Sequence, residues 1–306
     1  MGNIDFYSWM GGAICSVIAT LYYLVPLSLL YLFVLPLFGY FTFRHSLFLI
    51  TYIFLAYVPV KEVKKVRCSW FFRSMAKYFD AEIIRDGDDK VYEENGKNFL
   101  LLAMPHGVIS FGGLAVATLD PPIKGPTAVA SVLLRFPILR HIFSIFGLIS
   151  SNRESILRTL KTQNVYLYPG GMAELFLSDP NDEKLYFAKR KGCISLAMEA
   201  GADIVVCYIF GNTSMFNVVK IGHLARLSRF LRSSVTFFWG RFYLPIPRQT
   251  KVIFAVSCPI KIPRISNPTQ DEIDTIHDRV KKEIVIIYEK YRHLHPEYRQ
   301  KPLNFV

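Results

Sequence analysis

Two short segments of this 306-residue sequence combine a glycine turn with a side chain that can take or hold a proton. In the first, Met104-Pro105-His106-Gly107, a histidine follows an apolar run. Imidazole titrates near neutral pH, so His106 could accept the proton of an attacking hydroxyl group. Pro105 and Gly107 form the turn, and Gly107 allows a backbone N–H to face a ligand. The alternative is a structural histidine buried with its hydrogen bonds satisfied.

The second segment ends a strand-like run in Pro169-Gly170-Gly171 and places a carboxylate, Glu174, three residues later. Two glycines let the backbone approach a ligand closely. N–H groups at Gly170 and Gly171, or at the first turn, could stabilise an oxyanion. Glu174 could orient His106 or contact the polar end of a substrate. One such turn is a common feature, but two at strand ends indicate a catalytic site.

The strands that position these turns are visible as five apolar runs, at 98–103, 127–132, 164–168, 203–210 and 251–256. Helix-like segments lie between them. Alternating strands and helices predict an α/β fold with a mostly parallel sheet and flanking helices. Both turns then lie at the carboxyl ends of strands, where open α/β sheets bind ligands.

Two helices have clear end signals. The segment 189–200 is followed by Gly201, a residue typical of helix C-termini. Thr269 and Glu272 have the spacing of a capping box, and apolar residues then recur at three- and four-residue steps up to Tyr291. The sequence therefore predicts a long C-terminal helix with one buried stripe.

The apolar and the basic residues occupy different parts of the chain. The formal net charge is +12, yet residues 1–60 contain one base, Arg44, and one acid, Asp5. Positions 6–43 and 46–60 carry no charged residue. A membrane-spanning helix needs about 20 apolar residues, so the first run is nearly long enough for two passes.

Residues 1–60 are therefore expected to form a transmembrane hairpin or an embedded pair of helices, ahead of one catalytic domain at 61–306. Bases at positions 61, 64, 65 and 67 follow directly and favour the cytoplasmic side for this domain. The alternative is the core of a soluble protein. A basic amphipathic helix is also predicted at 224–232, suited either to an anionic membrane surface or to an ordinary protein surface.

Several classes of protein fit the sequence poorly. The five cysteines have neither paired nor Cys-x-x-Cys spacing, so no disulfide framework and no metal site are expected. The charge is accompanied by no nucleic-acid-binding motif, so nucleic acid is not an expected partner. A serine hydrolase would need Gly-x-Ser-x-Gly, whereas the segment 107–112 has one residue too many before its serine.

In their order along the chain, these motifs resemble the diacylglycerol acyltransferase type 2 family, which includes monoacylglycerol and wax-alcohol acyltransferases. The resemblance covers most of residues 98–295. Its motifs are the two turns, Arg190-Lys191-Gly192, Gly201-Ala202-Asp203, Tyr208-Ile209-Phe210-Gly211, Arg135 to Arg140, and Asn267 to Asp274. Two positions depart from the pattern. Met104 replaces the first histidine of the usual animal motif, and Phe111 stands where the wider superfamily has an aspartate.

The resemblance implies a membrane-anchored O-acyltransferase of the endoplasmic reticulum, with its active site facing the cytoplasm and lipid droplets as a second location. It implies that acyl-CoA donates a fatty acyl group to a neutral lipid, with diacylglycerol first and monoacylglycerol or wax alcohols as alternatives. Membrane lipids are further partners, no cofactor is implied, and the oligomeric state is open.

Under that reading His106 is the general base, no acyl-enzyme forms, and Glu174 holds the imidazole tautomer. Arg190 and Lys191 are expected to bind the CoA phosphates, unless they form a solvated helix start. A non-catalytic, membrane-anchored lipid-binding protein is the alternative from another class. It accounts for the anchor but not for the two polar turns.

Overall fold

The structure is a computed structural model that describes residues 5–40, 42–92, 96–121, 123–177, 182–223, 226, 228 and 236–306. The amphipathic helix predicted at 224–232 lies largely outside the described residues.

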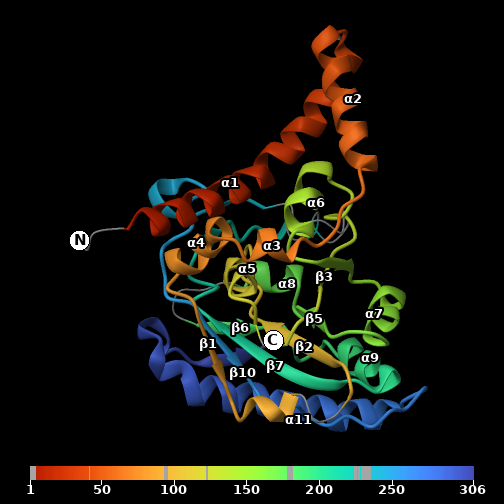
Figure 1. The fold of residues 1–306 in the computed structure, drawn as a ribbon, viewed down its shortest axis with the longest axis vertical. Helices are drawn as coiled ribbons and strands as arrows, with labels where there is room; N and C mark the ends of the chain where they lie inside the picture. Colours follow the sequence, from red (N-terminus) through yellow and green to blue (C-terminus); the bar gives the residue numbers. More distant parts are fainter. Residues whose placement is uncertain are drawn as a thin grey trace.

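A seven-stranded sheet forms the centre of the molecule, with the strand order β1-β10-β7-β2-β5-β3-β4 (Figure 1). The five strands from β7 to β4 are parallel, β10 is antiparallel to β7, and β1 is parallel to β10. The predicted α/β fold with a mostly parallel sheet is therefore confirmed. The strand bounds are Glu82–Arg85 (β1), Phe99–Met104 (β2), Thr127–Val129 (β3), Leu148–Ser150 (β4), Val165–Leu167 (β5), Asp203–Phe210 (β7) and Ile253–Val256 (β10).

Successive residues of β2 enter two different cores, because side chains of a strand alternate between the faces of a sheet. Leu100 and Leu102 pack with α9 (Gly192–Ala200) and α11 (Gln270–Tyr291) on one face. Leu101 and Ala103 pack on the other face, with α4 (Trp70–Tyr78), α5 (Phe111–Thr118) and α6 (Pro137–Ser144). All of β2 and β7 is buried, so these two strands form the centre of both cores.

The capping box predicted at the start of the last helix is present. Thr269 Oγ1 accepts from the Glu272 N–H at 3.3 Å, and the Glu272 carboxylate accepts from the Thr269 N–H at 2.8 Å. The predicted apolar stripe is buried along α11, at Ile276, Val280, Ile284, Ile287 and Tyr291. Gly201 ends α9 in the left-handed conformation, as expected.

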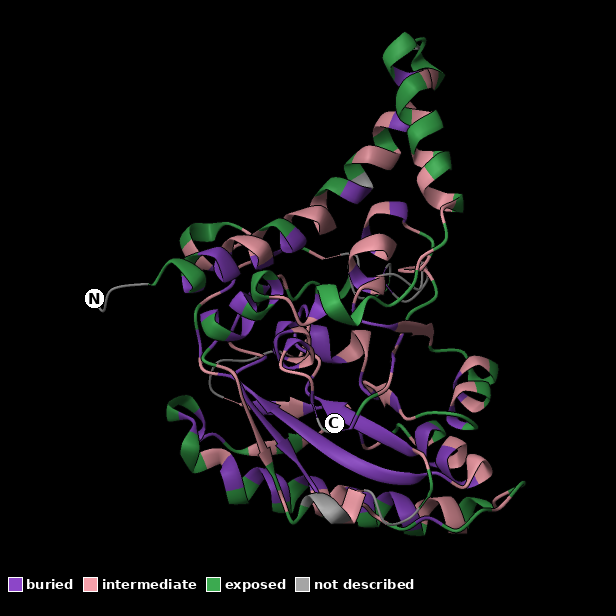
Figure 2. Ribbon diagram, in the orientation of Figure 1, coloured by how far each residue is buried: buried purple, intermediate pink, exposed green. Residues whose placement is uncertain are grey.

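The N-terminal segment begins with α1 (Phe6–Leu29) and continues through η1 (Leu30–Val34) and η2 (Leu35–Phe38). This run is long and apolar enough to cross a membrane. After a turn at Gly39, the shorter apolar helix α2 (Phe43–Tyr57) folds back against η1, where the Tyr31 and His45 rings stack with centroids 4.2 Å apart. The outer part of this pair projects from the body and is mostly exposed (Figure 2).

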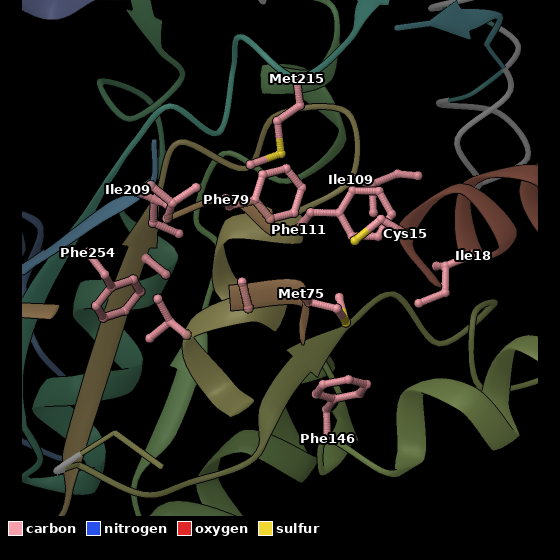
Figure 3. Packing of buried hydrophobic residues seen from close by; sticks show 14 of the residues in the cluster. Cys15, Ile18, Met75, Phe79, Ile109, Phe111, Phe146, Ile209, Met215 and Phe254 are labelled. Atoms are coloured by element: carbon pink, nitrogen blue, oxygen red, sulfur yellow. The ribbon is translucent and has the colours of Figure 1, made fainter. Parts of the chain in front are cut away.

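The inner part of α1 belongs to the core of the body. Cys15 and Ile18 pack in the same hydrophobic cluster as Phe111 of α5 and Ile209 of β7 (Figure 3). Gly11 allows this close packing, because a Cβ there would lie 2.0 Å from the Ser74 carbonyl oxygen of α4. A domain boundary at residue 60 stays a prediction, while Cys15, Ile18 and Val25 of α1 already pack in the core of the domain.

The C-terminus of α2 is held by α6. Arg140 donates to the carbonyls of Ala56 and Val58, and His141 Nε2 lies 2.8 Å from the Leu55 oxygen. Cationic and N–H donors satisfy the carbonyls that a helix end leaves unpaired. The remaining elements are α3 (Lys64–Arg67), η3 (Asp89–Tyr92), α7 (Arg153–Leu160), α8 (Met172–Leu175), β6 (Glu183–Leu185), β8 (Asn217–Val218), β9 (Phe238–Trp239), η4 (Arg241–Tyr243), η5 (Arg292–Leu294), η6 (Pro296–Tyr298) and β11 (Leu303–Phe305).

Candidate active site

His106 stands two residues after the end of β2, beyond Pro105, at the carboxyl edge of the parallel part of the sheet. Its Nδ1 lies 2.8 Å from the carbonyl oxygen of Gly107. A carbonyl only accepts hydrogen bonds, so Nδ1 carries the proton and Nε2 keeps a lone pair. The Tyr168 ring packs edge-on against the imidazole, with centroids 5.1 Å apart. The turn thus fixes both the tautomer and the position of the predicted base.

Burial lowers the pKa of His106 below its ordinary value of 6.5, and the Gly107 carbonyl opposes this with a smaller upward effect. Removing an imidazolium ion from water disfavours the charged form. The ring is therefore neutral at pH 7, which is the form that can accept a proton.

Glu174 contacts the backbone of the histidine turn, not its ring. Its carboxylate is buried and accepts from the backbone N–H of His106 at 2.8 Å and of Tyr186 at 3.2 Å. The expectation that Glu174 holds the imidazole tautomer is therefore not supported, because the Gly107 carbonyl occupies that position. Burial raises the pKa of Glu174 to about 7, against the effect of the two N–H donors.

The two glycines of the second turn, Gly170 and Gly171, are required for different reasons. A Cβ at Gly170 would lie 2.0 Å from the Glu174 carboxyl carbon, so the carboxylate reaches the His106 turn only past a glycine. Gly171 has a φ of +51° and lines a cavity beside the site. Gly107 and Gly170 are not among the residues that line this cavity.

Asn212 holds the His106 turn by hydrogen bonds, although no sequence pattern predicted this role. Its buried amide Nδ2 donates to the carbonyls of Pro105 at 2.9 Å and of His106 at 2.7 Å. Its Oδ1 accepts from the Gly112 N–H at 3.0 Å. Asn212 stands two residues after β7, the neighbour of β2 in the sheet. The strand-end argument that identified the other two turns could have found it.

The cavity has a volume of about 990 Å³, and its wall contains His106. Most of its lining is apolar. The helices α1, α5 and α6 and strand β3 contribute to this lining, including Tyr22, Val25, Leu27, Leu114, Ala128 and Phe143. Leu27 is 56% exposed, so the cavity extends from the catalytic turn to the outer part of α1. Such a long apolar space suits an aliphatic chain.

Arg190 and Lys191, which were predicted to bind acyl-CoA, lie in different environments. Arg190 lines the cavity together with Lys189, and its guanidinium lies 4.9 Å from the Tyr186 ring centroid and 3.4 Å from the Gly170 oxygen. Lys191 does not line the cavity and pairs with Asp274 of α11 at 2.6 Å. Arg190, but not Lys191, is thus placed to meet a ligand in this cavity.

Ser110 and Cys193 are two other potential nucleophiles near the site. The Ser110 hydroxyl donates to the Tyr168 hydroxyl at 2.8 Å. Burial raises the pKa of Cys193, which also lines the cavity, to about 12, so its thiolate is scarce at neutral pH. Within the described residues, no cluster of three or more His, Cys, Asp or Glu side chains could hold a metal ion.

The sequence is also similar to a known protein family and to individual known proteins. A family model described as diacylglycerol acyltransferase matches residues 37–305. A diacylglycerol O-acyltransferase of Schizosaccharomyces pombe is 28% identical over 222 residues, which are 65% of this chain and 64% of that protein. A diacylglycerol O-acyltransferase of Dictyostelium discoideum is 27% identical over 256 residues, 76% of each protein.

A human 2-acylglycerol O-acyltransferase is 25% identical over 251 residues, which are 74% of this chain and 72% of the human protein. Among solved structures, the 1-acyl-sn-glycerophosphate acyltransferase of Thermotoga maritima aligns with a TM-score of 0.43 at 14% identity, covering 89% of this chain and 97% of that chain.

Proposed function

Because the chain belongs to the diacylglycerol acyltransferase family and is an O-acyltransferase, we propose that it transfers a fatty acyl group from acyl-CoA to the free hydroxyl of diacylglycerol. One observation carries the mechanism. His106 is held as the neutral Nδ1–H tautomer on the wall of a long apolar cavity, with Nε2 left to accept a proton.

In this mechanism, Nε2 of His106 takes the proton of the acceptor hydroxyl as its oxygen bonds to the thioester carbon. The tetrahedral intermediate then collapses with cleavage of the carbon–sulfur bond. The imidazolium returns its proton to the departing CoA thiolate, which leaves as the thiol. The ring is neutral again, and the products are the new ester and CoA.

A direct transfer fits the cavity better than a covalent acyl-enzyme. A serine nucleophile would need its hydroxyl hydrogen-bonded to the base, whereas the Ser110 hydroxyl donates to Tyr168. The high pKa of Cys193 makes it a weak nucleophile. His106 can therefore act on the acceptor itself.

The turn at Gly170 and Gly171 is the proposed site for the oxyanion. Gly171 lines the cavity, and preorganised backbone N–H groups stabilise the negative oxygen of a tetrahedral intermediate. Glu174 contributes by fixing the His106 backbone against this turn, because it accepts from the His106 N–H. The N–H of Gly107, the alternative donor predicted from the sequence, is less well placed because Gly107 does not line the cavity.

The donor end of the cavity is proposed to be the basic end at Lys189 and Arg190, whose charges attract the CoA phosphates. Lys191 contributes less, because its ammonium group is neutralised by Asp274. The acyl chain would extend from there along the apolar wall towards α1.

The exposed apolar surface of the N-terminal helices supports membrane anchoring. Large apolar side chains such as Phe33, Leu37, Phe43, Ile50 and Phe54 are each at least half exposed. Exposed apolar surface of this extent marks a membrane or protein contact. We place the outer part of α1, η1, η2 and α2 in the membrane of the endoplasmic reticulum as a hairpin, while the inner part of α1 packs in the body. The body would then lie on the cytoplasmic side, where bases follow α2.

Monoacylglycerol is the second candidate acceptor, because a human relative is named as a 2-acylglycerol acyltransferase. Both acceptors present a hydroxyl on a glycerol unit, so the same base would serve either.

The test is an assay of membranes that contain the wild type or His106→Ala, with labelled acyl-CoA and diacylglycerol, monoacylglycerol or a long-chain alcohol offered in turn. The wild type should label diacylglycerol most rapidly, and His106→Ala should lower that rate by roughly 10²- to 10⁴-fold. His293→Ala is the matched control, because this exposed histidine lies outside the cavity. The assignment of the base fails if His106→Ala keeps its activity, and the function fails if no lipid is labelled.

A further inference from the structure

The hydroxyl group of Tyr168 lies at the cavity wall and has no role in the mechanism above. Tyr168 stands directly after β5, and its ring packs edge-on against the imidazole of His106. The phenol oxygen lies between two residues at the start of α5. It is 2.8 Å from the Ser110 oxygen, and a Cβ at Gly113 would lie 2.1 Å from it. All four residues line the cavity, so the hydroxyl is placed at its wall, next to the base.

Gly113 leaves the space that the phenol oxygen needs. No side chain fits there, because a Cβ cannot approach another heavy atom to 2.1 Å. Glycine inside a helix costs about 0.5–1 kcal/mol of stability relative to alanine. At Gly113 this cost is offset by room for a polar group on a mostly apolar wall.

The hydrogen bonds around Tyr168 leave its own proton for a ligand. Ser110 donates to the phenol oxygen, so the phenol proton points elsewhere. The Ser110 oxygen also lies 3.4 Å from the amide nitrogen of Asn212, which can only donate, and this favours Ser110 as an acceptor there and a donor to Tyr168. Among the residues that the structure describes, none accepts a hydrogen bond from the Tyr168 hydroxyl.

Tyr168 keeps this proton at neutral pH. Burial raises the pKa of its phenol to about 12, and the Ser110 hydrogen bond opposes this with a smaller downward effect. The phenol therefore does not compete with His106 as a base. It is a neutral donor, which can stabilise an oxygen that gains negative charge beside the imidazole.

The thioester carbonyl oxygen is the substrate oxygen that gains such a charge. It becomes negative when the tetrahedral intermediate forms. The acceptor hydroxyl, in contrast, gives its proton to His106, and a second donor on its oxygen would weaken the nucleophile. Tyr168 also leads directly into the Gly170-Gly171 turn, so one strand end would supply both backbone and side-chain donors to the same oxygen.

We propose that the Tyr168 hydroxyl donates a hydrogen bond to the thioester carbonyl oxygen of acyl-CoA and stabilises its negative charge in the tetrahedral intermediate. This inference rests on the proposed function and adds a catalytic side chain to it. The proton stays on the phenol oxygen throughout. When the carbon–sulfur bond breaks, the oxyanion becomes the carbonyl of the new ester, and the hydrogen bond weakens again. Ser110 acts as a positioning residue that orients the phenol.

The first test removes the hydroxyl and keeps the ring. Tyr168→Phe preserves the edge-on contact with His106, so the base keeps its place. With the full chain in membranes, kcat for transfer from labelled acyl-CoA to diacylglycerol should fall roughly 10²- to 10³-fold, the usual effect of losing one oxyanion donor. The KM of diacylglycerol should stay within about twofold, because the donor acts on the other substrate.

Tyr166→Phe is the matched control. Tyr166 belongs to the same strand and also lines the cavity, but its hydroxyl donates to the Ile123 carbonyl at 2.7 Å. This variant should keep kcat within roughly threefold, because its hydroxyl is already bound within the protein. Thermal unfolding of both variants shows whether a difference in kcat reflects stability instead.

The second test needs no acceptor lipid. Dissociation constants are measured for two unreactive analogues of acyl-CoA, a ketone in which a methylene group replaces the thioester sulfur and a thioether that lacks the carbonyl oxygen. The preference for the ketone over the thioether should be roughly three- to tenfold larger in the wild type than in Tyr168→Phe, the effect of one neutral hydrogen bond. Tyr166→Phe should keep the wild-type preference, which a merely structural role of Tyr168 would also leave unchanged.

A folded Tyr168→Phe protein with wild-type kcat would overturn the inference, as would an unchanged preference for the ketone. A raised KM of diacylglycerol at unchanged kcat would place the hydroxyl on the acceptor and overturn it as well. If the wild type labels no lipid, the proposed function fails, and the two analogues still decide whether Tyr168 binds the carbonyl oxygen.

Discussion

Replacing Gly107 by alanine tests how the catalytic turn fixes its histidine. Gly107 has a φ of +63°, in the left-handed region that side chains with a Cβ rarely adopt. A Cβ there would lie 2.7 Å from the Asn212 carbonyl oxygen and 3.2 Å from the Asn212 Nδ2. Both atoms belong to the residue that clamps the turn. The Gly107 carbonyl in turn holds Nδ1 of His106.

The structure gives the size of the effect. Alanine in the left-handed region costs about 1–3 kcal/mol. An ordinary contact begins at 3.4 Å, so the turn must also move by about 0.7 Å to relieve a contact of 2.7 Å with backbone. A misplacement of about 1 Å can cost 10²-fold in rate, so we expect Gly107→Ala to lower kcat roughly 10- to 100-fold. The KM values should change little, because Gly107 does not line the cavity.

The assay measures kcat and both KM values together with thermal unfolding of the purified protein. The control is Gly96→Ala. Gly96 has a similar φ of +56°, but a Cβ there meets no atom within 4 Å. Gly96→Ala should therefore show the backbone strain in its Tm without a loss of kcat.

A folded Gly107→Ala protein with wild-type kcat would refute this reasoning, because the imidazole would then not depend on the Gly107 carbonyl. Equal losses of kcat in both glycine variants would also refute it, since the effect would then be general destabilisation.

Three further predictions concern the same site. The acid side of the pH profile of kcat/KM should have an apparent pKa below 6.5, because burial lowers the pKa of His106 and activity is lost only once the ring is protonated; a value above 6.5 would contradict this. Asn212→Asp should lower both Tm and kcat, at about 1–3 kcal/mol of stability for each carbonyl of the turn that loses its donor, and unchanged unfolding would speak against the clamp. Arg190→Ala should raise the KM for acyl-CoA several-fold more than Lys191→Ala does, because Lys191 is paired with Asp274, and the reverse order would place CoA elsewhere.

The sequence by itself predicted five of the seven strands of the central sheet and the location of the candidate site, but it did not predict β1 and β4. Apolar runs gave the strands that precede His106 and the Gly170-Gly171 turn, and the strand order places both at one edge of the sheet. The capping box at Thr269 and the left-handed Gly201 were equally readable. These features depend on neighbours a few residues apart, where backbone geometry and residue type decide the outcome.

The tertiary structure decided which atoms meet. Glu174 is 68 residues from His106 and contacts its backbone, and Asn212 reaches the same turn from 106 residues away. Lys191 faces Asp274 of α11, although Arg190 beside it lines the cavity. Arg67, read from the sequence as a charge beside a membrane segment, lies buried on the cavity wall.

Such pairings depend on how helices and strands from distant parts of the chain pack together, and no local pattern records that. A slight rotation of α8 or α3 would give each side chain a different partner with no change in sequence spacing. Residue types and their periodicity therefore predicted the fold class and the candidate base, while packing alone determined the tautomer of His106, the hydrogen bonds of Asn212 to its turn and the shape of the cavity.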